Sequence, residues 1–188
     1  RKACKQKIYD FNQLPPSRQS KEAPQMIKNI FGKTGENVWV EAPFHCDYGW
    51  NIEVGENFYS NYNLTILDVG KVTCGKNVQI APNVSIYTAG HPVHPDSRNS
   101  GYEYGIPVTV GDNVWIGGNT VILPGVTVGS NVVIGAGSVV SKDIPDNTIA
   151  AGNPCKVIRE ITDEDRIYYF KKQKFDDEAW EEVKNKNK

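Results

Sequence analysis

A six-residue repeat is the feature that most constrains the fold of this 188-residue chain. From Val110 onward the chain divides into the blocks VGDNVW, IGGNTV, ILPGVT, VGSNVV, IGAGSV and VSKDIP, each opened by an aliphatic residue. Because helices repeat every 3.6 residues and two-faced strands every 2, a period of six fits neither as a long element. It fits a solenoid whose flat faces are short strands and whose corners are Gly, Asn or Asp. The repeat therefore predicts stacked coils about 4.8 Å apart with aliphatic ladders inside.

The repeat is interrupted between Ile86 and Val110. The blocks CGKNVQ, IAPNVS and IYTAGH precede the interruption, and a looser version of the pattern runs back to about Val38. The interruption spans 24 residues, or four whole hexads, so the count is kept although the aliphatic pattern is lost. The positions that break the pattern are Pro92, Arg98 and Tyr104. We interpret residues 92–107 as a loop that leaves the solenoid without changing its register.

The two ends of the chain have a different pattern. Residues 17–32 place Met26, Ile27, Ile30 and Phe31 at helical spacing before Gly32, which predicts a short helix that is interrupted or begins near Pro24. Residues 162–188 suggest one or two helical segments, the first capped by Thr162 and followed by acidic residues. We therefore divide the chain into a helical segment 1–33, a solenoid 34–161 and a helical tail 162–188. Both ends are expected to cover the open edges of the coil stack.

Composition excludes several classes of function. The 21 basic and 22 acidic residues give a net charge of -1, so there is no overall field to attract nucleic acid or an anionic membrane. No apolar run reaches the ~18–20 residues of a membrane span, and the opening RKACKQKIYDFN lacks the apolar core of a secretory signal, which favours the cytoplasm. The four cysteines show no metal-binding spacing, so we expect buried reduced thiols and no metal site. Nucleotide-binding loops of the Walker A or GxGxxG type are also missing.

Histidine is the scarcest catalytic group, with His45, His91 and His94 as its only occurrences. His91 follows Ala89-Gly90 at the point where the coil ends and the loop begins, and catalytic groups favour loops held on a rigid scaffold. A histidine has an ordinary pKa of ~6.5 and can accept and return a proton near neutral pH. We interpret His91 as a general base and His94 as a structural loop residue.

The longest motifs resemble one enzyme family. GHPVHPDSRNSGYEYGIPVTVGDNVWIGGNTVILPGVTVG and GAGSVVSKDIPDNTIAAGNPCKVIREI, together with CDYG and NFYSN upstream, resemble the maltose and galactoside O-acetyltransferases of the hexapeptide-repeat superfamily. The resemblance runs from about Tyr9 to Phe170. It implies a left-handed parallel β-helix, a homotrimer with active sites between subunits, and acetyl-CoA as cosubstrate. The loop 92–107 would then reach across to a neighbouring subunit.

The resemblance also implies a mechanism. Acetyl would pass directly from acetyl-CoA to a sugar hydroxyl in a ternary complex, with His91 removing the hydroxyl proton and then protonating the thiolate. The tetrahedral oxyanion needs hydrogen-bond donors, and the family pattern points to the Ser60-Asn61 region, so Asn61 is a second catalytic candidate. An acyl-enzyme on Cys46 or Cys74 is the rival mechanism, although neither thiol has an electropositive sequence context.

Further site residues follow from the same resemblance. The predicted acceptor-binding residues are Asp47, Asn61 and Glu103. The predicted acetyl-CoA-binding residues are Trp115, Gly118, Ala136, Ser141, Lys142, Lys156 and Arg159, in which small residues admit the pantetheine arm and cations neutralise phosphate. Asp47 and Val69 match the maltose enzymes better than the galactoside enzymes, which tend to have serine and aspartate there.

Several alternatives stay open at this point. Family members usually begin with a further helical segment before the match to KIYDFN, and this segment contributes to the acceptor site. The chain is therefore either a fragment or has a more open acceptor pocket. Another hydroxyl or amine acceptor within the same fold, and a non-catalytic trimeric binding module, are the alternative functions.

Overall fold

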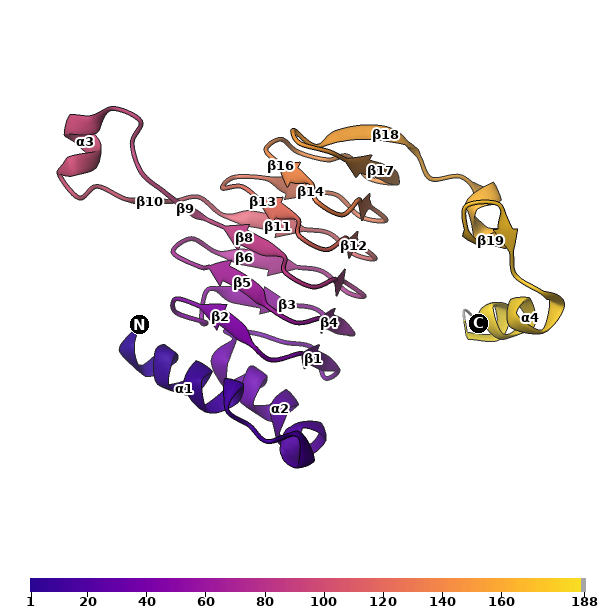
Figure 1. The fold of residues 1–188 in the computed structure, drawn as a ribbon, viewed down its shortest axis with the longest axis horizontal. Helices are drawn as coiled ribbons and strands as arrows, with labels where there is room; N and C mark the ends of the chain where they lie inside the picture. Colours follow the sequence, from indigo (N-terminus) through magenta and orange to yellow (C-terminus); the bar gives the residue numbers. More distant parts are fainter. Residues whose placement is uncertain (187–188) are drawn as a thin grey trace.

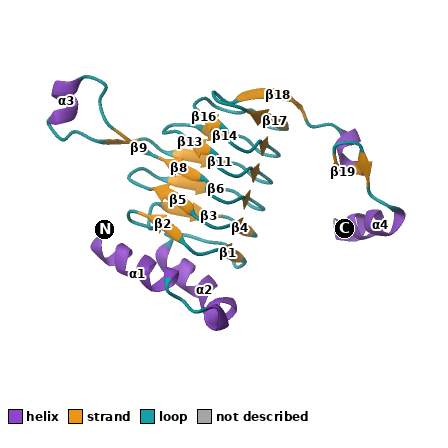
Figure 2. Cartoon of the chain, in the orientation of Figure 1, coloured by secondary structure: helices purple, strands orange, loops and turns teal. Residues whose placement is uncertain are grey.

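A parallel β-helix forms the centre of the molecule, as Figures 1 and 2 show. The structure is a computed structural model and describes residues 1–186. Each coil visits three parallel sheets in turn, which we name face I, face II and face III. The prediction of a hexapeptide-repeat β-helix is therefore confirmed.

The strands of each face follow the chain upward from the N-terminal end. Face I contains β1 (Val38–Val40), β4 (Phe58–Ser60), β7 (Gln79–Ile80), β12 (Trp115–Ile116), β15 (Val133–Ile134) and β17 (Thr148–Ala151). Face II contains β2 (Phe44–Cys46), β5 (Leu64–Leu67), β8 (Ser85–Tyr87), β13 (Val121–Ile122) and β16 (Val139–Val140). Face III contains β3 (Ile52–Val54), β6 (Val72–Cys74), β11 (Val108–Val110) and β14 (Thr127–Val128).

The aliphatic residues of the repeat fill the interior. Ile80, Ile116 and Ile134 pair in register on successive coils of face I, and each is at most 1% exposed. Burying such a side chain contributes roughly 1.5–3 kcal/mol relative to leaving it exposed. The interior ladder therefore supplies the main driving force for stacking the coils.

Asparagine forms most corners of the coil, as the sequence predicts. Among residues 1–186, eight asparagines adopt the left-handed backbone conformation with φ between 55° and 63°. Between faces III and I their side chains bond from coil to coil, so that Asn77 Nδ2 donates to Asn113 Oδ1 at 2.9 Å and Asn113 Nδ2 donates to Asn131 Oδ1 at 2.9 Å. Asparagine tolerates this conformation and also satisfies its own amide in the stack.

The corners between faces II and III, which we call the II–III edge, vary in length. Counted between the positions that pair from coil to coil, this corner spans residues 47–51 and 67–71 in the first two coils and only 123–125 in the fourth. On this count the corner includes the last residue of β5 and of β8. The third coil has the longest connection, residues 87–107. The sequence separation of paired strand residues follows these corner lengths. It is 20 residues for Val38 and Phe58 in the first coils, and 18 residues for Val121 and Val139 in the later coils. Across the loop Val72 pairs with Val108, 36 residues on, so the loop adds 18 residues to one 18-residue coil and the strands resume in register as predicted.

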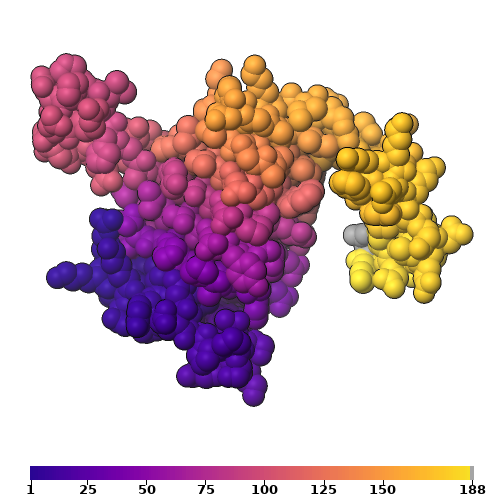
Figure 3. Space-filling view, viewed as in Figure 1, coloured from indigo at the N-terminus to yellow at the C-terminus, as the bar shows by residue number. Residues whose placement is uncertain are grey.

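Two helices cover the N-terminal end of the coil stack. The predicted helix over 17–32 is present as α2 (Pro16–Ile30), which contacts β1 and buries Ala23, Ile27 and Ile30. The expected interruption or start near Pro24 is wrong, because α2 begins at Pro16 and continues through Pro24. A second helix, α1 (Lys2–Asn12), was not predicted individually, and it buries Cys4, Ile8 and Phe11 against α2 and β2. Figure 3 shows this end as a continuous packed surface.

The C-terminal segment differs from the expected helical cover. Strand β18 (Lys156–Glu160) pairs antiparallel with β17 and so covers the last edge of face I. Beyond it the chain stands away from the coil in Figure 1. It forms a 3-10 turn (Asp163–Ile167), the hairpin β19 (Tyr168–Phe170) and β20 (Gln173–Lys174), and α4 (Asp177–Lys186). The expectation that this tail caps the stack by helices is wrong, because its aromatic side chains pack on each other, as Phe175 does on Tyr169 and Trp180.

Candidate active site

His91 lies at the root of the loop. The strands β9 (Ala89–Gly90) and β10 (Tyr104–Gly105) pair antiparallel and form the stem, and α3 (Pro95–Asn99) forms the tip. His91 follows the stem directly and is exposed. His94 is the N-cap of α3, where its Nδ1 accepts a hydrogen bond from the Asp96 N–H at 3.2 Å. The structure thus gives the two histidines different surroundings.

The hydrogen bond of His91 fixes which ring nitrogen is free. His91 Nδ1 lies 3.0 Å from the Tyr102 carbonyl oxygen. A carbonyl can only accept, so Nδ1 carries the proton and the neutral ring leaves Nε2 with an unprotonated lone pair. This arrangement suits a general base. Tyr102 was not among the predicted site residues, because a backbone carbonyl leaves no mark on a residue pattern.

Asp47 lies on the same II–III edge as His91. It is 7% exposed, and its Oδ1 forms an ion pair with Arg1 Nη2 at 2.6 Å. Asp47 raises the pKa of Arg1, first through this hydrogen bond and then through its charge, and smaller contributions come from Tyr48 and Glu103. Asp47 and Glu103, two of the predicted acceptor-binding residues, both lie on the II–III edge, Asp47 in its first corner and Glu103 in the loop.

Asn61 lies on a different edge, where faces I and II meet. It follows β4, and its Oδ1 accepts a hydrogen bond from the Tyr62 N–H at 2.8 Å. Within residues 1–186 no hydrogen bond from its Nδ2 is recorded, which leaves that amide as a donor toward solvent. The third predicted acceptor residue is thus separated from Asp47 and Glu103 by the width of face II.

The predicted acetyl-CoA-binding residues are also divided between these two edges. Gly118 and Ala136 stand above Asn61 on the I–II edge, where the Gly137 N–H donates to the Gly118 carbonyl at 2.8 Å. Trp115 points outward from face I beside them and is 55% exposed, and Lys156 pairs with Ala151 at the top of the same face. Ser141 and Lys142 instead follow β16 on the II–III edge.

The I–II edge is closely packed. A Cβ on Gly117 would lie 2.5 Å from the Ala136 N, and one on Gly118 would lie 3.1 Å from the Pro82 carbonyl oxygen. Only glycine allows the coils to approach this closely at position 117. The result is a narrow strip of small residues that leads from Asn61 toward Lys156.

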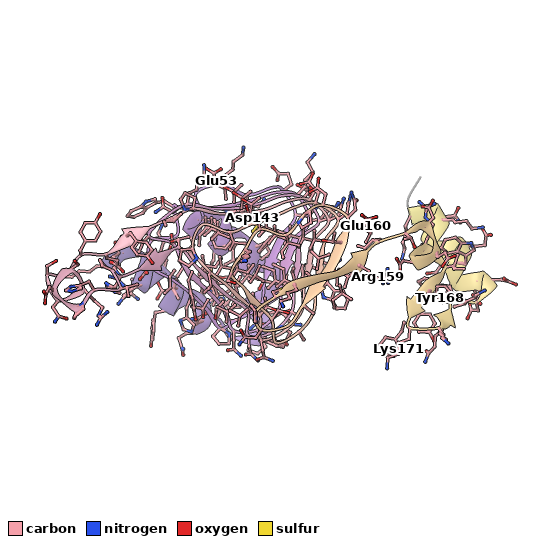
Figure 4. The ribbon with its side chains drawn as sticks, turned by 90° about the horizontal axis from the view of Figure 1, so that it is seen from above. Glu53, Asp143, Arg159, Glu160, Tyr168 and Lys171 are labelled. Atoms are coloured by element: carbon pink, nitrogen blue, oxygen red, sulfur yellow. The ribbon has the colours of Figure 1, made fainter. Side chains whose placement is uncertain are left out.

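Arg159 has a partner that the sequence analysis missed. Its guanidinium bonds both oxygens of Asp165, at 2.6 and 2.7 Å. This ion pair and the Thr162 N–H lower the pKa of Asp165 to about 2. Arg159 lines an open groove of about 520 Å³ with Tyr168, Lys171 and Lys172, and Figure 4 shows Arg159 on β18 and Tyr168 and Lys171 in the tail beyond it. The acidic residues that follow Thr162 in the sequence were the signal that could have indicated a partner for Arg159.

The cysteines are all free and buried. Burial raises the pKa of the Cys74 thiol to about 12 and holds the pKa of Cys46 far above its ordinary value. Cys46 Sγ lies 3.7 Å from Cys4 Sγ, which is also buried. A protonated, buried thiol is a poor nucleophile, so these surroundings disfavour the acyl-enzyme alternative.

Residues 1–186 contain no cluster of three or more His, Cys, Asp or Glu side chains that could hold a metal ion. Within the same residues, none of the helices combines the length and the apolar character needed to cross a membrane.

Comparison with known proteins first defines the class of the chain. Residues 107–142 match the bacterial transferase hexapeptide family model (six repeats), and residues 1–35 match the maltose acetyltransferase hexapeptide capping motif. The chain is thus a hexapeptide-repeat protein with an N-terminal cap of the maltose acetyltransferase type.

Individual relatives narrow the assignment. The chain is 55% identical over 167 residues to the galactoside O-acetyltransferase of Escherichia coli K12, covering 89% of this chain and 82% of that protein. A structure of galactoside acetyltransferase in complex with coenzyme A superposes with a TM-score of 0.91 at 53% identity, covering 94% of this chain and 88% of the other. The maltose O-acetyltransferase of Clostridium difficile 630 gives 0.84 at 53% identity, covering 87% of each chain.

This protein belongs to the maltose and galactoside O-acetyltransferase family. The resemblance inferred from the sequence motifs is therefore confirmed.

Proposed function

We propose that this protein transfers the acetyl group of acetyl-CoA to a hydroxyl of a sugar or glycoside. The observation that carries the proposal is the hydrogen bond from His91 Nδ1 to the Tyr102 carbonyl, which leaves Nε2 free to act as a base. Family membership supplies the reaction class, since the relatives are galactoside and maltose O-acetyltransferases, one of them with coenzyme A bound.

The proposed reaction proceeds without an acyl-enzyme. His91 Nε2 removes the proton of the sugar hydroxyl while its oxygen attacks the thioester carbonyl carbon. The tetrahedral intermediate then collapses, the carbon–sulfur bond breaks, and protonated His91 returns the proton to the coenzyme A thiolate. We assign the oxyanion donor to Asn61 Nδ2, and the hydrogen bond that the Asn61 Oδ1 accepts from the Tyr62 N–H supports this assignment because it leaves the Nδ2 group available to donate.

Binding of the two substrates is assigned by position. Asp47 and Glu103 accept hydrogen bonds from the hydroxyls of the sugar. Acetyl-CoA lies along the I–II edge past Gly118 and Ala136, with Trp115 beside it and Lys156 near its phosphates. Lys142 and Ser141 approach it from the II–III edge, and Arg159 contributes from β18.

A complete site of this kind needs two copies of the chain. His91 and Asp47 lie on the II–III edge whereas Asn61 and Gly118 lie on the I–II edge. In a closed ring of identical copies one edge of each copy faces the other edge of its neighbour. We therefore propose a homotrimer with three sites between subunits, in which face II, bounded by both edges, is turned toward the symmetry axis. The four free thiols favour the reducing cytoplasm as its compartment.

The direct test is an acceptor screen with detection of released thiol. Sugars and glycosides should release coenzyme A with wild-type protein, and His91→Ala should abolish most of the release. If the wild type binds no coenzyme A and releases none with any acceptor, the protein is a binding module and the proposal is wrong. Release with amines but not with sugars would identify the other acceptor class.

A mixing experiment tests the shared site. His91→Ala and Asn61→Ala are each expected to be nearly inactive. When the two variants are refolded together, about a quarter of the sites would combine an intact His91 with an intact Asn61 from a neighbour. Recovery of activity supports the shared site, and mixed assemblies that stay inactive would contradict it.

A further inference from the structure

The turn Asp47–Tyr48–Gly49–Trp50 carries an aromatic pair that the proposed reaction does not use. The rings of Tyr48 and Trp50 lie 5.0 Å apart between centroids with their planes inclined at 47°. Trp50 is 60% exposed. A large ring held against a second ring and still open to solvent is a surface suited to stacking with another flat or apolar face.

The turn is rigid because one buried carboxylate holds it. Asp68 is 0% exposed and accepts three backbone hydrogen bonds, from Asp47 N–H at 2.8 Å, Tyr48 N–H at 2.9 Å and Gly49 N–H at 2.7 Å. Gly49 has φ +80°, a conformation that favours glycine. Asn51 Nδ2 closes the turn by donating to the Asp68 carbonyl oxygen at 2.8 Å. The aromatic pair is thus fixed relative to the Asp47 side chain.

The same turn carries a predicted acceptor-binding residue. The Asp47 carboxylate lies in the turn with the two rings and forms an ion pair with Arg1 Nη2 at 2.6 Å, and the loop that contains Glu103 leaves the coil on the same II–III edge. Carboxylates bind the hydroxyls of a sugar, whereas the C–H faces of a pyranose ring or an aryl group favour aromatic surfaces. The turn offers both kinds of contact next to each other.

We propose that Tyr48 and Trp50 form a subsite for the second group of the acceptor, meaning the sugar ring or aryl group attached to the sugar that is acetylated. Asp68 is the positioning residue of this subsite, since it acts through the backbone of the turn. The inference rests on the proposed function and deepens it, because it makes the enzyme prefer glycosides over single sugars.

The first experiment compares maltose with glucose in wild type and Trp50→Ala. Loss of a stacking contact should raise the KM for maltose about two- to tenfold, with little change in the KM for glucose or acetyl-CoA. Trp50→Phe should restore most of the difference. Tyr9→Ala is the matched control, because Tyr9 is a similarly exposed ring (62%) on α1. An unchanged ratio of the two KM values in Trp50→Ala would overturn the subsite.

The second experiment tests Asp68 as a positioning residue. Asp68→Asn places an amide where three N–H groups need acceptors, so the KM for both sugars should rise while the Kd of acetyl-CoA, measured by calorimetry, stays unchanged. A parallel rise in both quantities would mean a general loss of structure and contradict the positioning role. If this variant does not fold, the Trp50 series decides alone.

Binding separates this inference from the proposed function. Calorimetry of maltose without acetyl-CoA should show weaker binding by Trp50→Ala than by wild type and Tyr9→Ala. If wild type transfers acetyl to no sugar but this difference is present, the proposed function fails and the subsite stands. If transfer occurs and the variants bind maltose equally, the subsite fails alone.

Discussion

The II–III edge and the I–II edge of the same β-helix are built in opposite ways. On the I–II edge every coil turns within three residues, as 61–63, 81–83, 117–119 and 135–137 do. On the II–III edge the corners are lengthened in each of the first three coils, up to residues 87–107. The predicted base and two acceptor residues lie on the lengthened edge, and the narrow edge carries the glycine strip. The regular three-residue corners thus stack into a straight edge, whereas the lengthened corners carry side chains away from the coil, where the predicted base and two of the predicted acceptor residues lie.

The largest loss of activity should come from a substitution on the lengthened II–III edge. His91→Ala removes the proposed base and should lower kcat about 10²–10⁴-fold with small changes in either KM. Steady-state kinetics with maltose and acetyl-CoA measure this. His94→Ala is the control, since His94 caps α3, and it should retain most of the activity. Equal losses in both variants would contradict the distinction between the two histidines.

On the narrow edge, Asn61→Ala removes the proposed oxyanion donor. The expected loss in kcat is about 10²–10³-fold, without loss of acetyl-CoA binding. Asn61→Asp keeps the size of the side chain but replaces the donor by an acceptor, so it should be as inactive as the alanine variant. An active aspartate variant would show that the side chain is a corner residue only.

Packing should distinguish Gly117 on the I–II edge from Gly101 in the loop by the effect of an alanine on the stability of the coil. Gly117→Ala forces a Cβ to 2.5 Å from the Ala136 N and should destabilise by about 1–3 kcal/mol, which corresponds to a lowering of Tm by several degrees. Gly101→Ala in the loop, with φ +83° and no atom within 4 Å, carries only the cost of a left-handed alanine, about 1–2 kcal/mol, and because this cost is confined to the loop the coil transition should stay unchanged. Calorimetric melting compares them. Equal effects would show that the narrow edge is not tightly packed.

The smallest effect is expected on the order of the tail, residues 162–186, which stands away from both edges of the coil. Because Arg159 and the Thr162 N–H lower the pKa of Asp165 to about 2, this contact favours the ordered tail above the ordinary pKa of an aspartate and is lost as the pH falls through about 2. Asp165→Asn should therefore loosen the tail at pH 7 and speed proteolysis after Lys171 and Lys172, with no shift in coil melting. Protection equal to wild type would mean that the ion pair does not hold the tail.

Much of this architecture could be predicted from the sequence, and the exceptions have physical causes. Inward aliphatic residues such as Ile116 must recur wherever a coil stacks, so the hexads predict strands, corners and the loop. The stacking of coils does not require corners of a fixed length, so the five-residue corner 47–51 departs from the six-residue repeat and is visible in the sequence only as a looser version of it. The whole-hexad spacing between Ile86 and Val110 is not a requirement either, since the five-residue corners break the count and the coil still continues.

The remaining misses have a similar origin. The spacing of Cys4, Ile8 and Phe11 is helical, so α1 was visible in principle. The hairpin after Ile167 could not be predicted from the repeat, because its side chains pack on each other and away from the coil. The resemblance supplied the site residues by position in the chain. It could not tell that His91 and Asn61 lie on different edges, since that depends on the three-dimensional coil.

The reversal of β18 on β17 has a consequence for how large such a molecule can become. A stack of parallel coils ends in open strands that another molecule could extend without limit, giving a fibre. Here the upper edge of face I is occupied by a strand of opposite direction, and α2 lies against β1 at the other end. Parallel growth along the coil axis is therefore interrupted on face I at the upper end and opposed by α2 at the lower end, which favours sideways association, toward the long edges where substrates are proposed to bind.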